Sequence, residues 1–446
     1  MTWKTTTLSS WGRAQAEVAA ARPERIGEAL DILAEPLDGG LLAHGAGRSY
    51  GDVALNSGGH QLLTGRLDRL LGFDPASGQV VAEAGVTFDD LRRVFLPRGF
   101  VPPVIPGTGF ATLGGAVAND VHGKNHDHAG SFGNHLDWID IALPNSAVVR
   151  CSASDLPELF EATIGGIGLT GIILQMAFRM VRVPSGELMV REERIPDLDT
   201  FLAAFAHARR HSTFSVGWID AMARGRSLGR GIIETAEWAP LPSRRWRERK
   251  PLQVPCDFPA MALNPLSVAA FNQLYWHRVP EGGREREVPA DRFFHPLDRL
   301  HDWNRIYGKR GFHQFQCVLP DAAAEQGLTA LLTEIGNSRA ASFLAVLKTL
   351  GSAGLGALSF PQRGYTLALD FPHRRRVWEL LRRLEAITLD HGGRIYLAKD
   401  SALSPEGFAR MYPRLEEFRG LLDQIDPEQR MTSSMARRLG LREVRA

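Results

Sequence analysis

The sequence predicts an α+β fold with at least two domains. A chain of 446 residues is too long to fold around one simple core. Short segments with strand alternation and short segments with helical spacing follow one another along the chain. The glycine-rich loops end before Pro184, and residues 186–235 continue with short helices and strands but without such loops. We therefore expect one domain over residues 1–185 and a second from residue 186.

Composition and charge exclude several classes of protein. Hydrophobic residues make up 44% and charged residues 23%, as in ordinary globular proteins, and the net charge of +2 does not indicate nucleic acid as a partner. Cys151, Cys256 and Cys317 are too far apart for a disulfide scaffold or a CxxC metal site. No window has the roughly 18 apolar residues of a membrane span, and the N-terminus lacks the apolar core of a secretion signal. We expect a cytoplasmic protein, at most peripheral to a membrane.

The expected elements can be placed in chain order from their periodicity. Helical spacing predicts helices over 24–36, 87–95 (with Thr87 as N-cap), 156–164, 322–335 and 377–389, and then to residue 438. Alternation and β-branched residues predict strands at 41–43, 62–63, 79–84, 138–143, 312–319, 343–349, 365–371 and 395–399.

Two glycine-rich segments dominate the first domain. HGAGRSYGD at 44–52 follows a short apolar strand, and the run 105–135 contains Pro106-Gly107-Thr108-Gly109 and then Gly114-Gly115-Ala116. Such turns leave successive backbone N–H groups bare, and these form concavities that bind anions. Each segment alone is weak evidence, but together they predict a cradle for the diphosphate of a cofactor.

A polar cluster follows the second cradle directly: His122, Lys124, Asn125, His126 and His128. Titratable groups next to a phosphate cradle indicate chemistry beside a bound cofactor. A metal site is disfavoured, because Gly123 and Asn125 oppose the helix that would align His122 with His126, and no Cys or Glu joins them.

The run Gly166–Gly171 matches the G-x-G-x-x-G dinucleotide fingerprint, which needs a strand before it and a helix after it. Here a helical pattern precedes it and an alternating β-branched run follows it. We therefore reject a nicotinamide-binding site at this position.

The segment 239–292 has no convincing periodicity over about fifty residues, which is long for a connection inside a compact domain, so we expect a mobile lid. Its basic run SRRWRERK at 243–250 is either a solvated loop or a contact with an anionic membrane surface or a substrate phosphate. Further on, strand alternation places Gln314 and Gln316 on one face, where their amides suit either sugar hydroxyls or solvent.

The chain resembles flavoproteins of the vanillyl-alcohol-oxidase (PCMH-type FAD-binding) family. The resemblance rests on four motifs in this order: HGAGRSYGD, PGT(x)5GGA, HGKNHxxAGSFGNH and GGxGLTGI. The likeness is greatest to the decaprenylphosphoryl-β-D-ribose 2′-oxidase group. It continues through HPLDRLHDWNRIYG (295–308), GFHQFQ, LSFPQRGY and YLAKDS (396–401) to SSMARRL (433–439), and covers nearly all of the chain except 239–292.

This resemblance implies a two-part FAD-binding domain, 1–185 and 394–446, with an inserted α+β substrate domain over 186–393. It implies FAD as the cofactor, bound non-covalently, because Arg48 stands where many relatives attach FAD through a His. Carried over by position, the residues expected to line FAD are Gly45, Ala46, Gly47, Arg48, Ser49, Tyr50, Gly107, Thr108, Thr112, Gly114, Gly115, Ala116, Asp120, His122, Gly123, Gly168, Ile173 and Tyr396.

By the same resemblance, the substrate pocket draws on Tyr50, His122, Lys124, Gln314, Gln316, Lys348 and Lys399. The implied reaction oxidises the 2-hydroxyl of a polyprenyl-phosphoryl-ribose to a keto sugar, and an NADH-dependent reductase partner then completes an epimerisation to arabinose. The proton acceptor would be Lys399, whose pKa Lys348 and Lys124 could lower, or else His122. Within RGYTLALDF, Thr366 and Ala368 replace the Asn and Cys of mycobacterial-type enzymes, so the polarity of the pocket differs.

Two other functions remain open at this point. The chain could be an FAD-dependent oxidase or dehydrogenase of free alditols or aldonolactones, in which case free polyols would bleach the flavin. It could also be a flavin-binding subunit without turnover, whose function would survive Lys399→Ala.

Overall fold

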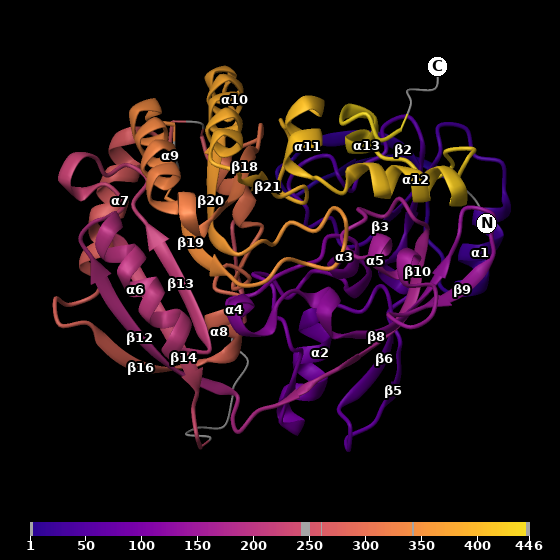
Figure 1. Cartoon of the computed structure of the whole chain (residues 1–446), viewed down its shortest axis with the longest axis horizontal. Helices are drawn as coiled ribbons and strands as arrows, with labels where there is room; N and C mark the ends of the chain where they lie inside the picture. The colour runs from indigo at the N-terminus through magenta and orange to yellow at the C-terminus, as the bar shows by residue number, and fades with distance from the viewer. Residues whose placement is uncertain (1–2, 242–249, 260, 341–342, 443–446) are drawn as a thin grey trace.

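The computed structural model describes residues 3–241, 250–259, 261–340 and 343–442 (Figure 1). Except for Lys250, the basic run SRRWRERK lies outside the described residues. The described residues form three larger sheets and two small ones, with helices packed on them, so the predicted α+β class is confirmed.

The first two larger sheets come from the N-terminal part of the chain. One is four-stranded, with the order β1 (Lys4–Ser9), β2 (Gln15–Ala21), β4 (His60–Leu63) and β3 (Leu41–His44). The other is antiparallel, with the order β5 (Leu70–Phe73), β6 (Gln79–Glu83), β10 (Ile172–Arg179), β8 (Leu136–Ala142) and β9 (Val148–Cys151). In the described residues this part also contains the helices α1 (Ile26–Ala34), α2 (Phe88–Phe95), α3 (Leu113–Ala118), α4 (His126–Ala129) and α5 (Pro157–Thr163). A capping box begins α2, because the Thr87 side chain accepts from Asp90 N and the Asp90 carboxylate accepts from Thr87 N.

The third sheet has eight strands and comes from the middle of the chain. Its order is β16 (Arg284–Pro289), β12 (Glu187–Ile195), β14 (Gly231–Trp238), β13 (Phe214–Ile219), β19 (Ala345–Leu350), β20 (Gly364–Pro372), β18 (Phe312–Pro320) and β21 (Arg394–Ile395). Three helices cover one face: α6 (Leu198–His211), α9 (Ala324–Ser338) and α10 (Arg375–Asp390) (Figure 1). The alternation predicted for β18 is confirmed, since Phe315 and Cys317 pack under these helices while Gln314 and Gln316 face the other way.

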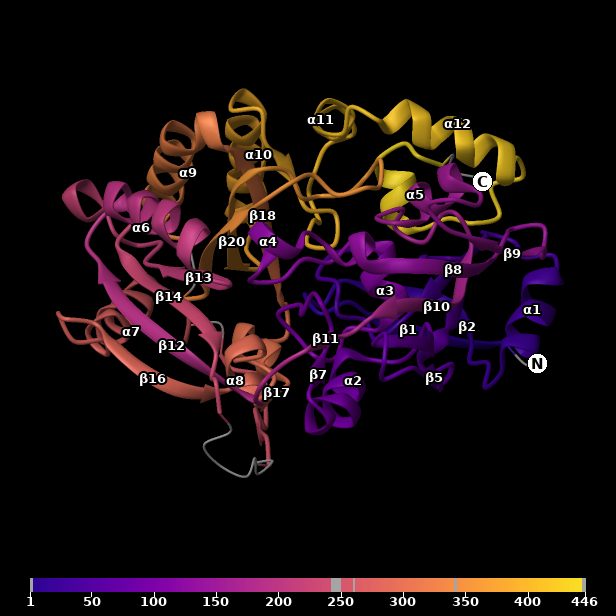
Figure 2. The same ribbon diagram turned by 60° about the horizontal axis from the view of Figure 1, so that its bottom comes forward.

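After β21 the chain returns to the first sheet through α11 (Pro405–Met411), α12 (Leu415–Ile425) and α13 (Ser434–Arg438) (Figure 2). Leu41 N donates to Arg430 O at 2.7 Å, and Thr432 N donates to Leu41 O at 3.1 Å. Sheet membership therefore changes close to residues 185 and 395. The division into an FAD-binding and a substrate domain stays a prediction.

The segment 239–292 differs from its prediction. It contains α7 (Pro265–His277), the edge strand β16 and the start of α8 (Ala290–Phe294). The prediction that this segment lacks regular structure was therefore wrong. Periodicity missed α7 because its apolar residues are distributed around the whole helix. The predicted strand 395–399 is also shorter: only Arg394–Ile395 pairs with β18, and residues 396–399 form a turn closed by Lys399 N donating to Tyr396 O.

Arg438 connects the returning segment to the first domain. Its guanidinium binds Asp52 at 2.8 Å and Asp400 at 2.8 Å, and the Asp400 side chain is only 5% exposed. We expect Arg438→Met to lower the free energy of unfolding by about 1.5–3 kcal/mol, because it leaves a buried carboxylate without its partner. Denaturant unfolding measures this loss; Arg419→Met, which removes an exposed i,i+3 pair with Glu416, should change the free energy by less than about 1 kcal/mol.

Candidate active site

A cavity of about 820 Å³ lies between the glycine-rich loops and the face of the eight-stranded sheet that does not carry α6, α9 and α10. Gly45 to Tyr50, Gly107, Thr108 and Phe110 to Thr112 line it from the loops, and Gln314, Gln316 and Lys348 line it from the sheet. Both predicted cradles therefore face the same cavity, as do the predicted sugar-binding residues.

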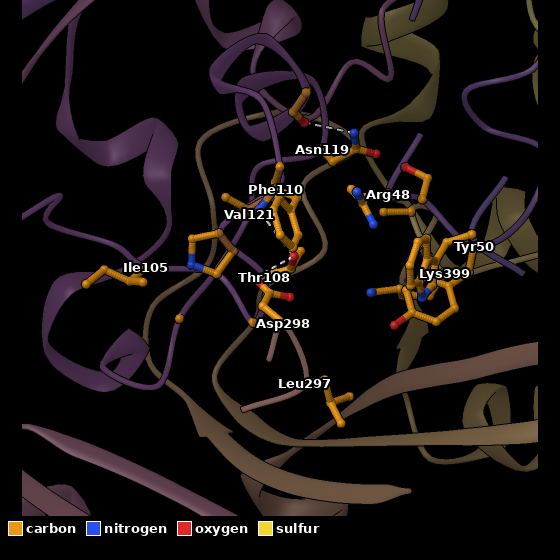
Figure 3. A pocket seen from close by; sticks show the side chains of 18 of the residues that line it. Arg48, Tyr50, Ile105, Thr108, Phe110, Asn119, Val121, Leu297, Asp298 and Lys399 are labelled. Carbon is orange, nitrogen blue, oxygen red and sulfur yellow. Dashed lines mark hydrogen bonds between the residues drawn. The ribbon is translucent and has the colours of Figure 1, made fainter. Parts of the chain in front are cut away.

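The first glycine loop is fixed against the turn that carries Lys399. Tyr50 N donates to Ala398 O at 3.0 Å. A Cβ on Gly51 would lie 1.7 Å from Asp400 O, so only glycine permits this approach. As a result Tyr50 and Lys399 lie side by side in the cavity, with Lys399 Nζ 3.8 Å from the centre of the Tyr50 ring (Figure 3).

The second glycine loop leaves room for a bound group. A Cβ on Gly107 would meet no atom within 4 Å, although Gly107 lines the cavity. The Arg48 guanidinium of the first loop lies 4.5 Å from the centre of the Trp11 ring and 4.7 Å from that of Phe110 in the second loop.

Three polar atoms on the cavity wall are buried without a hydrogen-bond partner among the described residues: Arg48 Nε, Asn119 Oδ1 and His122 Nδ1. Buried polar atoms are normally paired, so these atoms call for a polar ligand. Two donors and an acceptor along a largely apolar cavity with bare backbone turns fit a flavin and its diphosphate.

Lys399 has a strongly altered acidity. Burial lowers its pKa to about 7, the nearby Asp370 carboxylate raises it, and Lys348 lowers it. Burial therefore lowers the pKa of Lys399 more than the neighbouring lysines do, whereas the sequence suggested only these lysines. Lys124 lowers the pKa of Lys348 and not that of Lys399. At neutral pH a substantial part of Lys399 carries a free amine, which can accept a proton.

Asp370 on β20 connects the side chains of this part of the site by hydrogen bonds. It accepts hydrogen bonds from Gln314 Nε2 at 2.6 Å and from the Tyr307 hydroxyl at 3.0 Å. Burial raises the pKa of Asp370 to about 7, and its hydrogen bonds and Lys399 act in the opposite direction. The carboxylate thus fixes the amide of Gln314 and sets the charge near Lys399.

His122 is buried and contacts Gln316, whose Nε2 lies 3.1 Å from His122 Nε2 and 3.2 Å from Thr366 Oγ1. Because the amide nitrogen donates, His122 Nε2 accepts and the ring proton resides on Nδ1. Burial, followed by Lys348, His126 and Lys399, holds the pKa of His122 well below its usual range. His122 is therefore neutral at physiological pH.

Two further lysines carry charge into the cavity. Burial lowers the pKa of both Lys124 and Lys348 to about 8, so both are mainly protonated at pH 7. Lys124 Nζ donates to Phe293 O and lies 4.0 Å from the centre of the Phe293 ring. A positively charged region therefore lies beside the two amides, where an anionic substrate would be attracted.

Of the residues expected to bind cofactor or substrate, all but two line the cavity. Ala116 is fully buried in the core under the second sheet. Asp120 accepts from Gly133 N at 3.1 Å and from Ser359 Oγ at 2.6 Å, so it supports the loop behind the cavity and does not line it. The order of elements around Gly166–Gly171 is helix, loop, strand, as the sequence predicted. Among the described residues, no group of three or more His, Cys, Asp or Glu could hold a metal ion.

Sequence reasoning assigned no role to Trp11, Phe110, Asn119, Asp298 and Asp370. Asp298 accepts from Gly109 N at 2.6 Å and from Thr108 Oγ1 at 3.1 Å, and so connects the HPLDRL motif to the second cradle (Figure 3). Burial raises the pKa of Asp298 to about 6. The quoted motifs HPLDRLHDW and RGYTLALDF contain Asp298 and Asp370, but only the three-dimensional structure shows which of their residues reach the cavity.

The cradles, the cavity and its unpaired polar atoms define a FAD-dependent oxidoreductase. In agreement, the family model described as FAD binding domain matches residues 14–152, and the one described as D-arabinono-1,4-lactone oxidase matches residues 369–439.

Comparison with known proteins identifies the family. The chain is 36% identical to the decaprenylphosphoryl-β-D-ribose oxidase of Mycolicibacterium smegmatis over 97% of both chains. It is 34% identical to an uncharacterized protein of the mprA 5′ region of Streptomyces coelicolor, over 80% of this chain and 100% of that protein. L-gulonolactone oxidase of Mus musculus is 25% identical over 36% of each chain. The chain belongs to the decaprenylphosphoryl-β-D-ribose oxidase family.

Proposed function

We propose that this protein oxidises the 2-hydroxyl of the ribose in a polyprenyl-phosphoryl-ribose to a 2-keto sugar, the first half of an epimerisation to the arabinose form. The observation that carries the proposal is the polar end of the cavity, where Lys399, with a pKa of about 7, lines the same space as Gln314 and Gln316. The similarity to the M. smegmatis oxidase along the whole chain supports the choice of substrate.

A bound FAD would supply the acceptor for the hydride of the carbinol carbon. The protein contributes orientation and proton transfer. Gln314 and Gln316 present amides for the sugar hydroxyls, and the neutral amine of Lys399 takes the proton of the oxidised hydroxyl. Lys124 and Lys348 provide the positive charge for the phosphodiester.

FAD is proposed to bind without a covalent bond. The loop Gly45–Gly51 contains no histidine, and the Arg48 side chain lies between two aromatic rings. Acid precipitation should therefore release all of the flavin into the supernatant.

The proposed partners are the lipid-linked substrate and a short-chain NADH-dependent reductase that would take the keto sugar to the arabinose form. Peripheral contact with a membrane is proposed as well, since the substrate carries a polyprenyl chain. Among the described residues, no helix is long and apolar enough to cross a bilayer.

Anaerobic mixing with polyprenyl-phosphoryl-ribose tests the function. The oxidised flavin band should disappear in a single turnover, and a keto sugar should form in equal amount. Reduction by free alditols or aldonolactones but not by the lipid-linked ribose would contradict the proposal. A bound flavin that none of these sugars reduces would also contradict the proposal.

Asp370 offers a further test of the assignment of Lys399. Because the Asp370 carboxylate raises the pKa of Lys399, Asp370→Asn should move the pH at half-maximal flavin reduction downward, by the order of one unit. Single-turnover reduction measured from pH 5 to 9 reports this shift. The exposed Asp423→Asn on α12 is the matched control and should leave the pH profile unchanged.

A further inference from the structure

Helix α7 exposes apolar residues and buries a polar one. Leu266 and Leu274 are 83% and 76% exposed, while Asn272 is 1% exposed and its Nδ2 donates to Asp220 Oδ1 at 2.6 Å. Leu266, Ala270 and Leu274 follow at i, i+4 and i+8, so they form one outward stripe. A helix on a water-facing surface normally shows the opposite arrangement.

The exposed apolar residues are concentrated around this helix. Of thirteen large hydrophobic residues that are exposed in the described parts of the chain, seven fall between residues 241 and 274. Near the helix these include Phe258, Met261 and Phe271, with 40%, 79% and 41% exposure. Residues 258–277 contain no Asp, Glu, Lys or Arg. Single exposed leucines are ordinary, but a charge-free cluster indicates a binding surface.

Exposed cations lie on two sides of this cluster. Arg374 Nη2 donates to Leu263 O at 2.6 Å, which places the start of α10, with exposed Arg375 and Arg376, beside the cluster. Phe258 N donates to Arg305 O at 2.9 Å, which brings the exposed pair Lys309–Arg310 to another side. We call the five apolar residues and these four cations the α7 surface: Phe258, Met261, Leu266, Phe271, Leu274, Lys309, Arg310, Arg375 and Arg376.

We propose that the α7 surface docks this protein on the interface of an anionic phospholipid bilayer. Its leucines and Met261 would enter the boundary between headgroups and acyl chains, and its cations would meet the lipid phosphates. A second copy of the chain is a poorer occupant, because a twofold contact would bring the flanking cations close to one another. Both views place α7 at the end of the molecule opposite α1 (Figures 1 and 2).

The docking surface is connected to the cavity. Tyr275 and Arg278, on the opposite side of α7 and just after it, line the cavity, and the Tyr275 ring lies 4.8 Å from that of Trp218. This part of the inference rests on the proposed function: a substrate with a polyprenyl tail would stay partly in the bilayer while its sugar enters beneath α7.

Vesicle sedimentation of the flavin-loaded protein tests the proposal. Binding to phosphatidylglycerol–phosphatidylcholine vesicles should exceed binding to pure phosphatidylcholine, and Leu266→Glu/Leu274→Glu should lower the vesicle affinity at least tenfold. Leu71→Glu/Val148→Glu is the matched control, since these residues are 47% and 48% exposed in the second sheet, and should bind as the unmodified chain does. Arg375→Gln/Arg376→Gln should weaken binding to anionic vesicles and reduce its dependence on salt.

Three outcomes would overturn the proposal. These are failure of the unmodified protein to bind anionic vesicles, unchanged binding by Leu266→Glu/Leu274→Glu, and a dimer in sedimentation velocity that this double variant dissociates. Turnover with a water-soluble short-chain polyprenyl-phosphoryl-ribose separates the two proposals. This turnover should be unchanged in the double variant, so loss of vesicle binding with intact turnover shows that the two leucines act in docking and not in catalysis. If the unmodified protein binds vesicles but does not turn over this substrate, only the proposed function is contradicted.

Discussion

Lys399→Met is expected to slow flavin reduction by the lipid-linked ribose about 10²–10⁴-fold, while the protein keeps its flavin. Methionine has nearly the length of lysine and preserves the packing against Tyr50, but it has no amine to receive the hydroxyl proton. The Lys399 amine is buried, lies 3.8 Å from the centre of the Tyr50 ring, and has a pKa of about 7. Stopped-flow absorbance in the absence of oxygen measures the rate.

The pH dependence identifies the base. A general base must be neutral, so the rate of the unmodified enzyme should rise with pH through about 7 and become constant above it, as Lys399 loses its proton. His122 has a pKa held well below its usual range, so a reaction that used His122 would show no such rise near 7. The exposed Lys4→Met on β1 is a control for loss of positive charge. A flat profile, or an undiminished rate in Lys399→Met, would remove Lys399 from the mechanism.

Local patterns were sufficient to predict many of the residues that meet around the cavity. Two glycine-rich loops in the same domain predict a ligand-binding site more strongly than one loop does, and both loops line one cavity. The period of two in β18 fixed the side of the sheet on which Gln314 and Gln316 lie, because one face had to be apolar under α9 and α10.

Other features depend on contacts between distant segments, which periodicity does not contain. Asp370 belongs to the site only because β20 pairs with β18 and β19, which bring it to Gln314. The low pKa of Lys399 arises mainly from burial, and the sequence alone suggested only neighbouring charges. Helix α7 was missed because its outward stripe is apolar, and the proposed bilayer contact would be the physical reason for that pattern.

Gly107→Val is expected to yield a folded protein that binds FAD at least about 100-fold more weakly, a loss of roughly 2.8 kcal/mol. A Cβ at Gly107 meets no protein atom within 4 Å, and its backbone is not left-handed, so the substitution costs the fold little. The valine side chain would instead enter the cavity that the two cradles enclose. Gly114→Val is a less specific test, because its Cβ would lie 2.9 Å from Ala84 Cβ and would move α3 (Leu113–Ala118).

Flavin content after purification and titration of the apoprotein with FAD measure the effect of Gly107→Val. Gly420→Val on α12 is the matched control: its Cβ is equally unobstructed, but it lies on an exposed surface away from the cavity, so full flavin content is expected. Thermal unfolding of the two apoproteins should agree, which separates loss of the cofactor from loss of the fold. A Gly107→Val protein that retains one flavin per chain would show that the Pro106–Gly109 turn does not approach the cofactor, and the cradle would then have to be assigned elsewhere.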